Sequence, residues 1–354
     1  MRLRSVSAPL IAAALCAASV LLTAACAAAA VPAVHAAAAP DRARPLPAQL
    51  YAPYFEGWRN TPIPSIARRS GVRYFSLAAL QTAHPGSCTL TWNGDPGLPI
   101  RPGGRFTSQI AALRAMGGDV LITLGGSTAG QTGTEIADSC SSVDKIAKAY
   151  ENIITSYGVT RLDMDVEEGA LNDNAGIERR SEAIAQLEQW AKATHRRVQV
   201  DLTLGIVPWE LPPSSVKVIR SAVVHHAAIT VVNAMAFDYF TTTKTVHMGA
   251  AAISALRAMH RQLAKLYPGR SSQQLWRMEG VTLMIGLDDN PAKNEVTHPA
   301  DARQVAAFAN AHQLPLVSIW AIQRDNGRCP GHKGSNSCSG IRQPTWQFSH
   351  ILAR

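Results

Sequence analysis

The segment TRLDMDVEEG, residues 160–169, alternates acidic and apolar side chains. Asp163, Asp165 and Glu167 are spaced by two, with one apolar residue between each pair. In a β-strand, residues two apart point to the same face of the sheet, so the three acids would form one row with steps of about 6.5 Å. The opposite face would be wholly apolar, as expected where helices cover a sheet. The segment therefore predicts a buried strand of an α/β fold.

The rest of the chain repeats the combination of strand and helix. Short runs rich in β-branched and aromatic residues alternate with stretches whose apolar residues recur every three or four positions. We predict strands at residues 50–55, 72–77, 119–124, 160–167, 198–204, 231–237, 281–286 and 316–320. The clearest helices between them are predicted at residues 142–157, 178–195 and 299–312. Eight such units in about 300 residues predict a single-domain (β/α)8 TIM barrel.

A doubly wound parallel sheet is the alternative architecture. Such sheets have a switch-point crevice and often a phosphate-binding loop after a strand. The glycine-rich segment GGSTAG, residues 125–130, has neither GxGxxG nor GxxxxGK spacing. It therefore predicts a tight turn between a strand and a helix, and the barrel remains the expected fold.

The first 36 residues have the build of a secretory signal peptide. Arg2 and Arg4 precede an apolar stretch at residues 10–22 and an alanine-rich segment with a predicted cleavage site at residues 34–36. The apolar stretch is shorter than the roughly 20 residues of a transmembrane anchor. We therefore expect secretion without stable membrane insertion, a linker at residues 37–49 and a catalytic domain at residues 50–354. Lipid attachment at Cys26 is the alternative, although Thr23 occupies a position that is usually a bulky aliphatic residue.

Composition and charge narrow the class of partner. Hydrophobic residues make up 47% of the chain and charged residues 17%, which excludes a disordered or low-complexity protein. The formal charge is +9, but no dense run of lysine and arginine is present, so we expect no nucleic-acid partner. The excess of positive charge fits surface solvation and mild attraction to anionic polymers.

Four cysteines follow the predicted leader, which suggests two disulfides in an exported chain. Cys329 and Cys338 are separated by nine positions across a turn-rich segment, which favours a local pair. That pairing leaves Cys88 with Cys140. A zinc site is the alternative, but the chain has no CxxC or HExxH spacing, so we expect no metal and no cofactor.

The row of acids points to proton-transfer chemistry. Burying three like charges so close together raises their pKa values, because desolvation and mutual repulsion both disfavour the charged form. A carboxyl group that keeps a proton near neutral pH can act as a general acid for glycosidic cleavage. The alternatives are a surface strand with its acids in water and a divalent-metal site.

The same segment resembles the DxxDxDxE motif of glycoside hydrolase family 18, the chitinases and related endo-N-acetylglucosaminidases. Thr160 replaces the first aspartate of the motif, whereas Asp163, Asp165 and Glu167 match the rest. LITLGG, residues 121–126, is similar to the SxGG signature of the family, with Thr123 in place of serine.

Four further regions carry the resemblance, which covers residue 50 to the end of the chain. NAMAFDYF, residues 233–240, is similar to the MxYD-type sequence: Met235 and Asp238 match, Phe237 occupies the usual tyrosine position, and Tyr239 follows the acid. SIWAIQRDNG, residues 318–327, places Trp320 like the tryptophan that floors the sugar site. YAPYFEGW, residues 51–58, and MIGLDDN, residues 284–290, look like a bacterial chitinase subgroup.

The resemblance implies substrate-assisted retaining catalysis, in which the 2-acetamido oxygen of the sugar is the nucleophile. Glu167 would protonate the glycosidic oxygen and later activate water. Asp165 would orient the acetamido group, and Asp163 would share a proton or hydrogen bond with Asp165.

The resemblance also implies substrate contacts. These would come from Tyr239, Asp238, Met235 and Trp320. Trp58, Trp92 and Trp209 lie near predicted loops at the top of the barrel, where each could be either a sugar platform or a core residue. His225 and His226 are expected in helix packing or at the surface.

The function expected from this resemblance is that of a secreted monomeric chitinase. It would cleave β-1,4 bonds between N-acetylglucosamine units of chitin or its oligosaccharides. The alternatives are an endo-β-N-acetylglucosaminidase acting on glycoprotein glycans and a non-catalytic chitin-binding barrel.

Overall fold

Parallel strands close into a barrel in the computed structural model, which describes residues 45–240, 246–289, 295–332 and 336–353. The first barrel strand consists of two pieces, β1 (Leu50–Tyr51) and β2 (Tyr54–Glu56). The first piece pairs with β12 (Leu316–Trp320), and the second pairs with β3 (Tyr74–Thr82). Because this strand joins both ends of the strand order, the sheet has no open edge, and the doubly wound alternative is wrong.

Neighbouring barrel strands follow the chain order. After β3 come β5 (Asp119–Gly125), β6 (Arg161–Val166), β7 (Gln199–Gly205), β8 (Ile229–Met235) and β9 (Glu279–Met284), each parallel to the next, and β9 then pairs with β12. The short strand β4 (Leu90–Trp92) pairs antiparallel with β3. A separate hairpin joins β10 (Gly286–Leu287) to β11 (Val296–Thr297).

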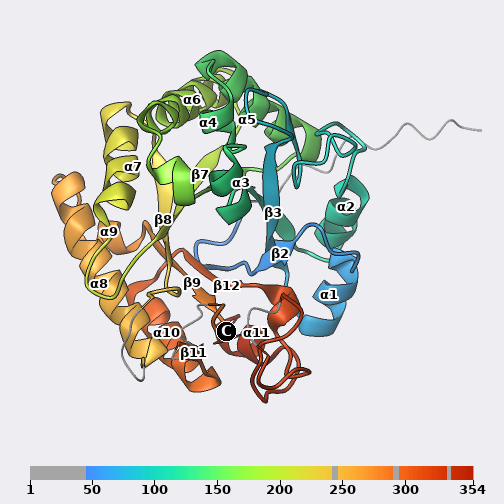
Figure 1. Ribbon diagram of the computed structural model, residues 1–354, viewed down its shortest axis with the longest axis vertical. Coiled ribbons are helices and arrows are strands. Elements are labelled where there is room, and N and C mark those ends of the chain that lie inside the picture. The colour runs from blue at the N-terminus through green and yellow to red at the C-terminus, as the bar shows by residue number, and fades with distance from the viewer. Residues whose placement is uncertain (1–44, 241–245, 290–294, 333–335, 354) are drawn as a thin grey trace, which may run out of the picture. The chain divides into compact units, whose positions relative to one another are not determined.

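Helices surround the strands, as Figure 1 shows. The longer helices are α1 (Ile63–Ser70), α2 (Thr107–Ala115), α5 (Val143–Tyr157), α6 (Asn174–Ala193), α7 (Pro213–Val224), α8 (Met248–Leu266) and α10 (Pro299–His312). The short ones are α3 (Ser127–Thr132), α4 (Ile136–Ser139), α9 (Ser272–Trp276), α11 (Gln347–Leu352) and the 3-10 turns η1 (Glu168–Leu171) and η2 (Ile322–Arg324). The barrel and these helices belong to one unit, Ala39–Arg354.

Local sequence signals explain where the helices begin and end. The Ser142 hydroxyl accepts a hydrogen bond from the Lys145 backbone N–H and caps the start of α5. Gly158 ends this helix with a φ of 62°, a conformation that glycine adopts without steric cost. Proline at the first position starts α10 at the predicted residue, because its fixed φ suits the helix and its missing N–H is not needed there.

The barrel interior changes character along its axis. At one end the apolar side chains Leu50, Ala52, Leu121, Val231 and Leu316 pack together. At the other end a second small cluster contains Tyr54, Ala78 and Ala321, with Trp320 packed against it. The main hydrophobic core lies between the strands and the helices, where the outward-facing residues of β6, Leu162, Met164 and Val166, are buried.

Most of the predicted elements are confirmed. All predicted strands occur, with boundary shifts of up to two residues except at β3, which ends five residues after the predicted end, and helix α10 has the predicted bounds. Helix α6 begins four residues before the predicted start at residue 178 and ends two residues before the predicted end. The predicted leader at residues 1–36 and most of the linker lie outside the described residues. Within the described residues, no helix combines the length and apolar character needed to cross a bilayer.

Both predicted disulfides are present. Cys88, which lies between β3 and β4, is bonded to Cys140 at the end of α4. Cys329 is bonded to Cys338 within the segment that connects η2 to α11. The first bond therefore ties the segment after β3 to the end of α4, the second closes a local loop, and together they use all cysteines of the described residues.

Candidate active site

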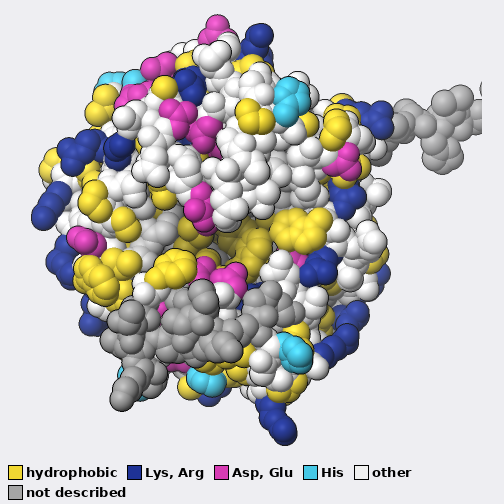
Figure 2. Space-filling view, viewed as in Figure 1, with side chains coloured by type: hydrophobic (Ala, Val, Ile, Leu, Met, Phe, Trp, Pro, Cys, Tyr) yellow, Lys and Arg dark blue, Asp and Glu magenta, His cyan; other side chains and the backbone are white. Residues whose placement is uncertain are grey.

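The carboxyl ends of the parallel strands share one end of the barrel, which is where residues after β5, β6, β8 and β12 can meet. Figure 2 shows a hollow in the middle of one face, lined by hydrophobic side chains and bordered by acidic side chains. The residues that the sequence predicts as functional can be located by their hydrogen bonds and ring contacts.

Asp163 lies inside the barrel and is held by hydroxyl groups from three strands. Tyr54 Oη and Thr123 Oγ1 donate hydrogen bonds to its Oδ2, at 2.7 and 2.9 Å. Thr203 Oγ1 donates to Oδ1 at 2.6 Å. Burial raises the pKa of Asp163, and these three donors oppose that rise by stabilising the carboxylate. The carboxyl group is therefore fixed in position on both oxygens.

Asp165 is the next acid of the row and is also buried, with 7% of its surface exposed. Its Oδ1 has no hydrogen-bond partner among the described residues. Burial raises its pKa well above the usual value, and the charges of Glu167 and Asp163 raise it further. Asp165 therefore favours a proton and has an unused oxygen with which to orient another group.

Two glycines allow the backbone of β5 to approach Asp165. Gly126 N–H donates a hydrogen bond to the Asp165 carbonyl oxygen at 2.9 Å. A Cβ on Gly125 would lie 2.2 Å from the same oxygen, and the φ of Gly125 is 95°. Both the close contact and the dihedral angle exclude a larger side chain at this position. This explains the LITLGG sequence in physical terms.

Glu167 directly follows β6, and its side chain is half-buried. Burial raises its pKa to about 7, and the charges of Glu168 and Asp289 add to the rise. A hydrogen bond from the Ser127 backbone N–H, at the start of α3, lowers it. Glu167 can therefore hold a proton near neutral pH while remaining partly accessible. These interactions place its side chain at the end of the strand, near the start of α3 and near Asp289, which follows β10.

A buried ion pair lies below the acids and was missed by the sequence analysis. Arg161 Nε donates to Asp201 Oδ2 at 2.6 Å, and the two side chains are 3% and 0% exposed. The positive charge of Arg161 lowers the pKa of Asp163. Part of the signal for this pair lies in the sequence, because Arg161 precedes Asp163 by two positions and therefore shares its face of the strand. The other part is the register of β6 and β7, which places Asp201 beside Asp163.

Aromatic rings lie beside the acids. Trp320, at the end of β12, has its ring centroid 5.7 Å from that of Tyr54 and 6.2 Å from that of Trp58. Tyr54 thus contacts both Trp320 and Asp163, which fixes the ring next to the row of acids. Trp58 is 43% exposed and offers an open face, consistent with a platform for a pyranose ring.

The other predicted tryptophans differ from each other. Trp92 is fully buried, and its Nε1 donates to Tyr157 Oη at 2.7 Å. It packs edge-on against Phe106, so it is a core residue and cannot serve as a sugar platform. Trp209 is 62% exposed in the segment after β7 and remains available for binding.

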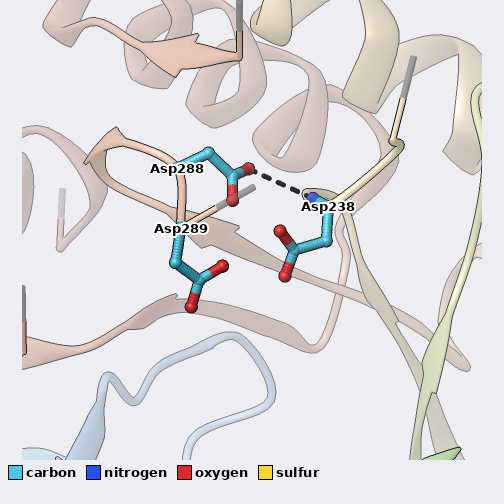
Figure 3. A group of neighbouring side chains, drawn as sticks. All are labelled: Asp238, Asp288 and Asp289. Carbon is cyan, nitrogen blue, oxygen red and sulfur yellow. Dashed lines mark hydrogen bonds between the residues drawn. The ribbon is translucent and has the colours of Figure 1, made fainter. Parts of the chain in front are cut away.

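Asp238 belongs to a cluster of three aspartates, shown in Figure 3. Its backbone N–H donates to Asp288 Oδ2 at 3.1 Å. Burial raises the pKa of Asp238 to about 10, and hydrogen bonds and repulsion from Asp288 and Asp289 contribute. Asp288 and Asp289 belong to the MIGLDDN segment, whose resemblance to the bacterial subgroup was the available signal.

This cluster could offer ligands to a cation, because carboxylate oxygens of its three members lie within 4.8 Å of one another. Two features already compensate its charge. Asp238 retains a proton at neutral pH, and the buried Arg324 guanidinium interacts favourably with Asp289, Asp288 and Asp238. The cluster can therefore be explained as a shared proton beside a buried cation.

The remaining predicted residues differ in burial and, within the described part of the chain, form no hydrogen bond with the row of acids. Met235 is half-buried at the end of β8, on the side facing Gly205. Tyr239 is buried in the main hydrophobic core, and its backbone N–H donates to Glu295 Oε2 at 2.9 Å. Its hydroxyl is not open to solvent in this structure, so its contact with substrate stays a prediction. His225 ends α7 and contacts Glu178, as expected for a surface residue.

Comparisons with known proteins agree with this geometry, although no family model matches the chain. The chain is 31% identical over 321 residues to the probable bifunctional chitinase/lysozyme of Escherichia coli (strain K12). The aligned region covers 87% of this chain and 34% of that protein. The chain is also 30% identical over 289 residues to endochitinase 11 of Metarhizium anisopliae, covering 79% of this chain and 53% of that protein. The chain thus spans about a third and about half of these two relatives.

Solved structures give the same fold. The catalytic domain of a hyperthermophilic chitinase from Pyrococcus furiosus has a TM-score of 0.76 and 27% identity, covering 88% of this chain and 96% of that one. A chitinase from Chromobacterium violaceum has a TM-score of 0.56 at 10% identity, a likeness of fold alone.

The ion pair below the acids can be tested by a thermodynamic cycle. Asp201→Asn should lower the free energy of unfolding by about 3 kcal/mol, because it leaves the buried Arg161 charge without its partner. The double variant Arg161→Met, Asp201→Leu should recover most of that loss. Urea unfolding at pH 7 measures both. A single variant as stable as the wild type, or a double variant less stable than the single, would contradict the assignment.

Proposed function

Because this chain has a chitinase-like domain of glycoside hydrolase family 18, we propose that it hydrolyses β-1,4 bonds between N-acetylglucosamine units of chitin or its oligosaccharides. The observation that carries the proposal is Glu167. It ends a row of buried acids at the carboxyl end of a barrel strand, and burial raises its pKa to about 7. A carboxylic acid in that position can protonate the oxygen of a leaving sugar.

The proposed mechanism uses the substrate's own acetamido group as the nucleophile, an exception to the scheme with two enzyme carboxylates. Glu167 donates its proton to the glycosidic oxygen as the bond to C1 breaks. The acetamido carbonyl oxygen forms the new bond to C1, giving an oxazolinium ion. Glu167, now a carboxylate, then takes a proton from the water that attacks C1, while the bond between C1 and the acetamido oxygen breaks and the acetamido group is regenerated. The proton and the configuration at C1 are both restored.

Asp165 is suited to orient the acetamido group. Its Oδ1 lacks a partner among the described residues and can accept a hydrogen bond from the acetamido N–H. The oxazolinium ion carries a positive charge, which favours the negatively charged form of Asp165. The negative charge of Asp165 in turn raises the pKa of Glu167, which helps Glu167 to take a proton from water in the second step. Asp163, held by three hydroxyl donors, is suited to share a proton with Asp165 without moving.

Trp320 and Trp58 are suited to bind the sugar rings. A pyranose ring has an apolar face that packs well against an indole. Trp320 is fixed by Tyr54, which also holds Asp163, so a ring stacked on Trp320 would lie close to the acids. We propose secretion as well, since the two disulfides suit an oxidising compartment.

The function can be tested with two substrates and one variant. Purified protein should release short products from chitin oligosaccharides and leave a high-mannose glycoprotein intact. Cleavage of the glycoprotein would favour the endo-N-acetylglucosaminidase alternative, and binding without cleavage would favour the non-catalytic barrel. Glu167→Gln should fold normally and lose about a thousandfold or more in kcat, because an amide cannot donate the proton.

The matched control for that variant is Glu168→Gln, which changes the adjacent exposed acid. Glu168→Gln should retain activity, whereas Glu167→Gln should not. Equal melting temperatures of the two variants would show that the loss of activity does not come from misfolding. Near-wild-type turnover of Glu167→Gln would remove Glu167 from the mechanism.

The pH profile tests the protonation state of Glu167. Since the acid must be protonated in the free enzyme, kcat/KM should fall about tenfold per pH unit above a limb near pH 7. In Glu168→Gln this limb should move to lower pH, because the charge of Glu168 raises the pKa of Glu167. An unchanged limb, or one that moves to higher pH, would contradict this electrostatic account.

A further inference from the structure

A cavity of about 270 Å³ lies between α1, the residues that follow β2, and the segment from η2 to α11. Three arginines line it: Arg59, Arg69 and Arg328. The remaining described lining residues are apolar or uncharged, and none is a carboxylate. The walls therefore carry positive charge only.

The cavity adjoins the aromatic end of the candidate active site. Arg59 directly follows Trp58, whose ring contacts Trp320. Gln323 follows Trp320 by three positions, lines the cavity, and accepts a hydrogen bond from the Glu56 backbone N–H at 3.2 Å. The same two chain segments thus form the aromatic platform and a wall of the cavity. A sugar chain on that platform would have substituents within reach of the cavity.

Two of the three arginine charges are not compensated. Arg59 is paired with the buried Glu56, at 2.8 Å. Arg69 and Arg328 form no ion pair with a carboxylate of the described residues. The Arg69 guanidinium lies over the Trp346 ring, 5.7 Å from its centroid. This cation–π contact uses the face of the ring and no N–H group of Arg69, so the guanidinium keeps its hydrogen-bond donors.

We propose that this cavity binds a carboxylate carried by the saccharide in the active site, so that acidic N-acetylhexosamine chains are preferred ligands. The inference rests on the proposed function, because it requires a sugar chain on the Trp58–Trp320 platform. A guanidinium edge forms two parallel hydrogen bonds with a carboxylate, which are stronger than neutral ones. Ile66 and Trp346 add apolar walls, which suit a short apolar stem between sugar ring and carboxylate.

The test measures binding with a pair of ligands that differ only in charge. One is a tetrasaccharide of alternating N-acetylglucosamine and N-acetylmuramic acid, and the other is the same compound with its carboxylates reduced to alcohols. Calorimetric titration uses the full chain with Glu167→Gln, which prevents cleavage. The acidic ligand should bind about tenfold or more tightly at low salt, and the difference should shrink as salt is added.

Variants identify the cavity as the source of the preference. In the Glu167→Gln protein, the further substitutions Arg69→Gln and Arg328→Gln should abolish the difference in affinity between the acidic and the neutral ligand. The affinity for the neutral ligand should stay unchanged. Arg68→Gln is the matched control, because Arg68 is an exposed neighbour on the same helix and does not line the cavity. It should keep the preference.

Several results would overturn the proposal. The first two are equal affinity for the two ligands and binding of neither ligand. The third is a preference for the acidic ligand that survives the substitutions at Arg69 and Arg328, and the fourth is a loss of that preference in Arg68→Gln as large as the loss caused by those two substitutions. The last would indicate attraction to the general surface charge. Failure of the proposed function would appear separately, as wild-type protein that does not cleave neutral chitin oligosaccharides.

Discussion

The desolvation of three neighbouring carboxyl groups is the constraint on which the rest of the structure depends. Asp163 and Asp165 lie on β6 and Glu167 directly follows it, and this strand offers them no opposite charge except Arg161 below. Each acid compensates the free-energy cost of desolvation in a different way. Asp163 is stabilised by hydroxyl donors, Asp165 favours protonation, and Glu167 lies where burial is partial. All three pKa values are therefore raised, each with a different balance of burial, hydrogen bonding and neighbouring charge.

The closed barrel makes this arrangement possible. The donors to Asp163 come from β2, β5 and β7, which only a curved sheet brings around one point inside it. Tyr54 has a second role, because its ring supports Trp320 while its hydroxyl binds Asp163. The lower end of the row of acids and the aromatic platform are therefore linked through one side chain. The cationic cavity extends the same platform toward substituents of the sugar chain, on the side of Arg59.

Much of this could be predicted from the sequence, because period-two alternation on a strand determines which side chains share the interior. That reasoning located Asp163, Asp165 and Glu167, and the order of strands followed from the alternation with helices. It missed the Arg161–Asp201 pair, since partnership across strands depends on register. It also left Trp92 undecided, because burial of a loop-adjacent tryptophan depends on tertiary packing against Phe106 and Tyr157. The charge environment of Glu167 includes Asp289, more than 100 positions away, which no local pattern reveals.

We infer that Glu167 keeps its proton close to neutral pH in the folded protein. Its side-chain carboxyl can be followed by carbon NMR in protein labelled at the glutamate δ-carbon, with Glu167→Gln used to assign the signal. We expect a titration midpoint near pH 7. A midpoint near 4.5, the ordinary value for a solvated glutamate, would contradict it.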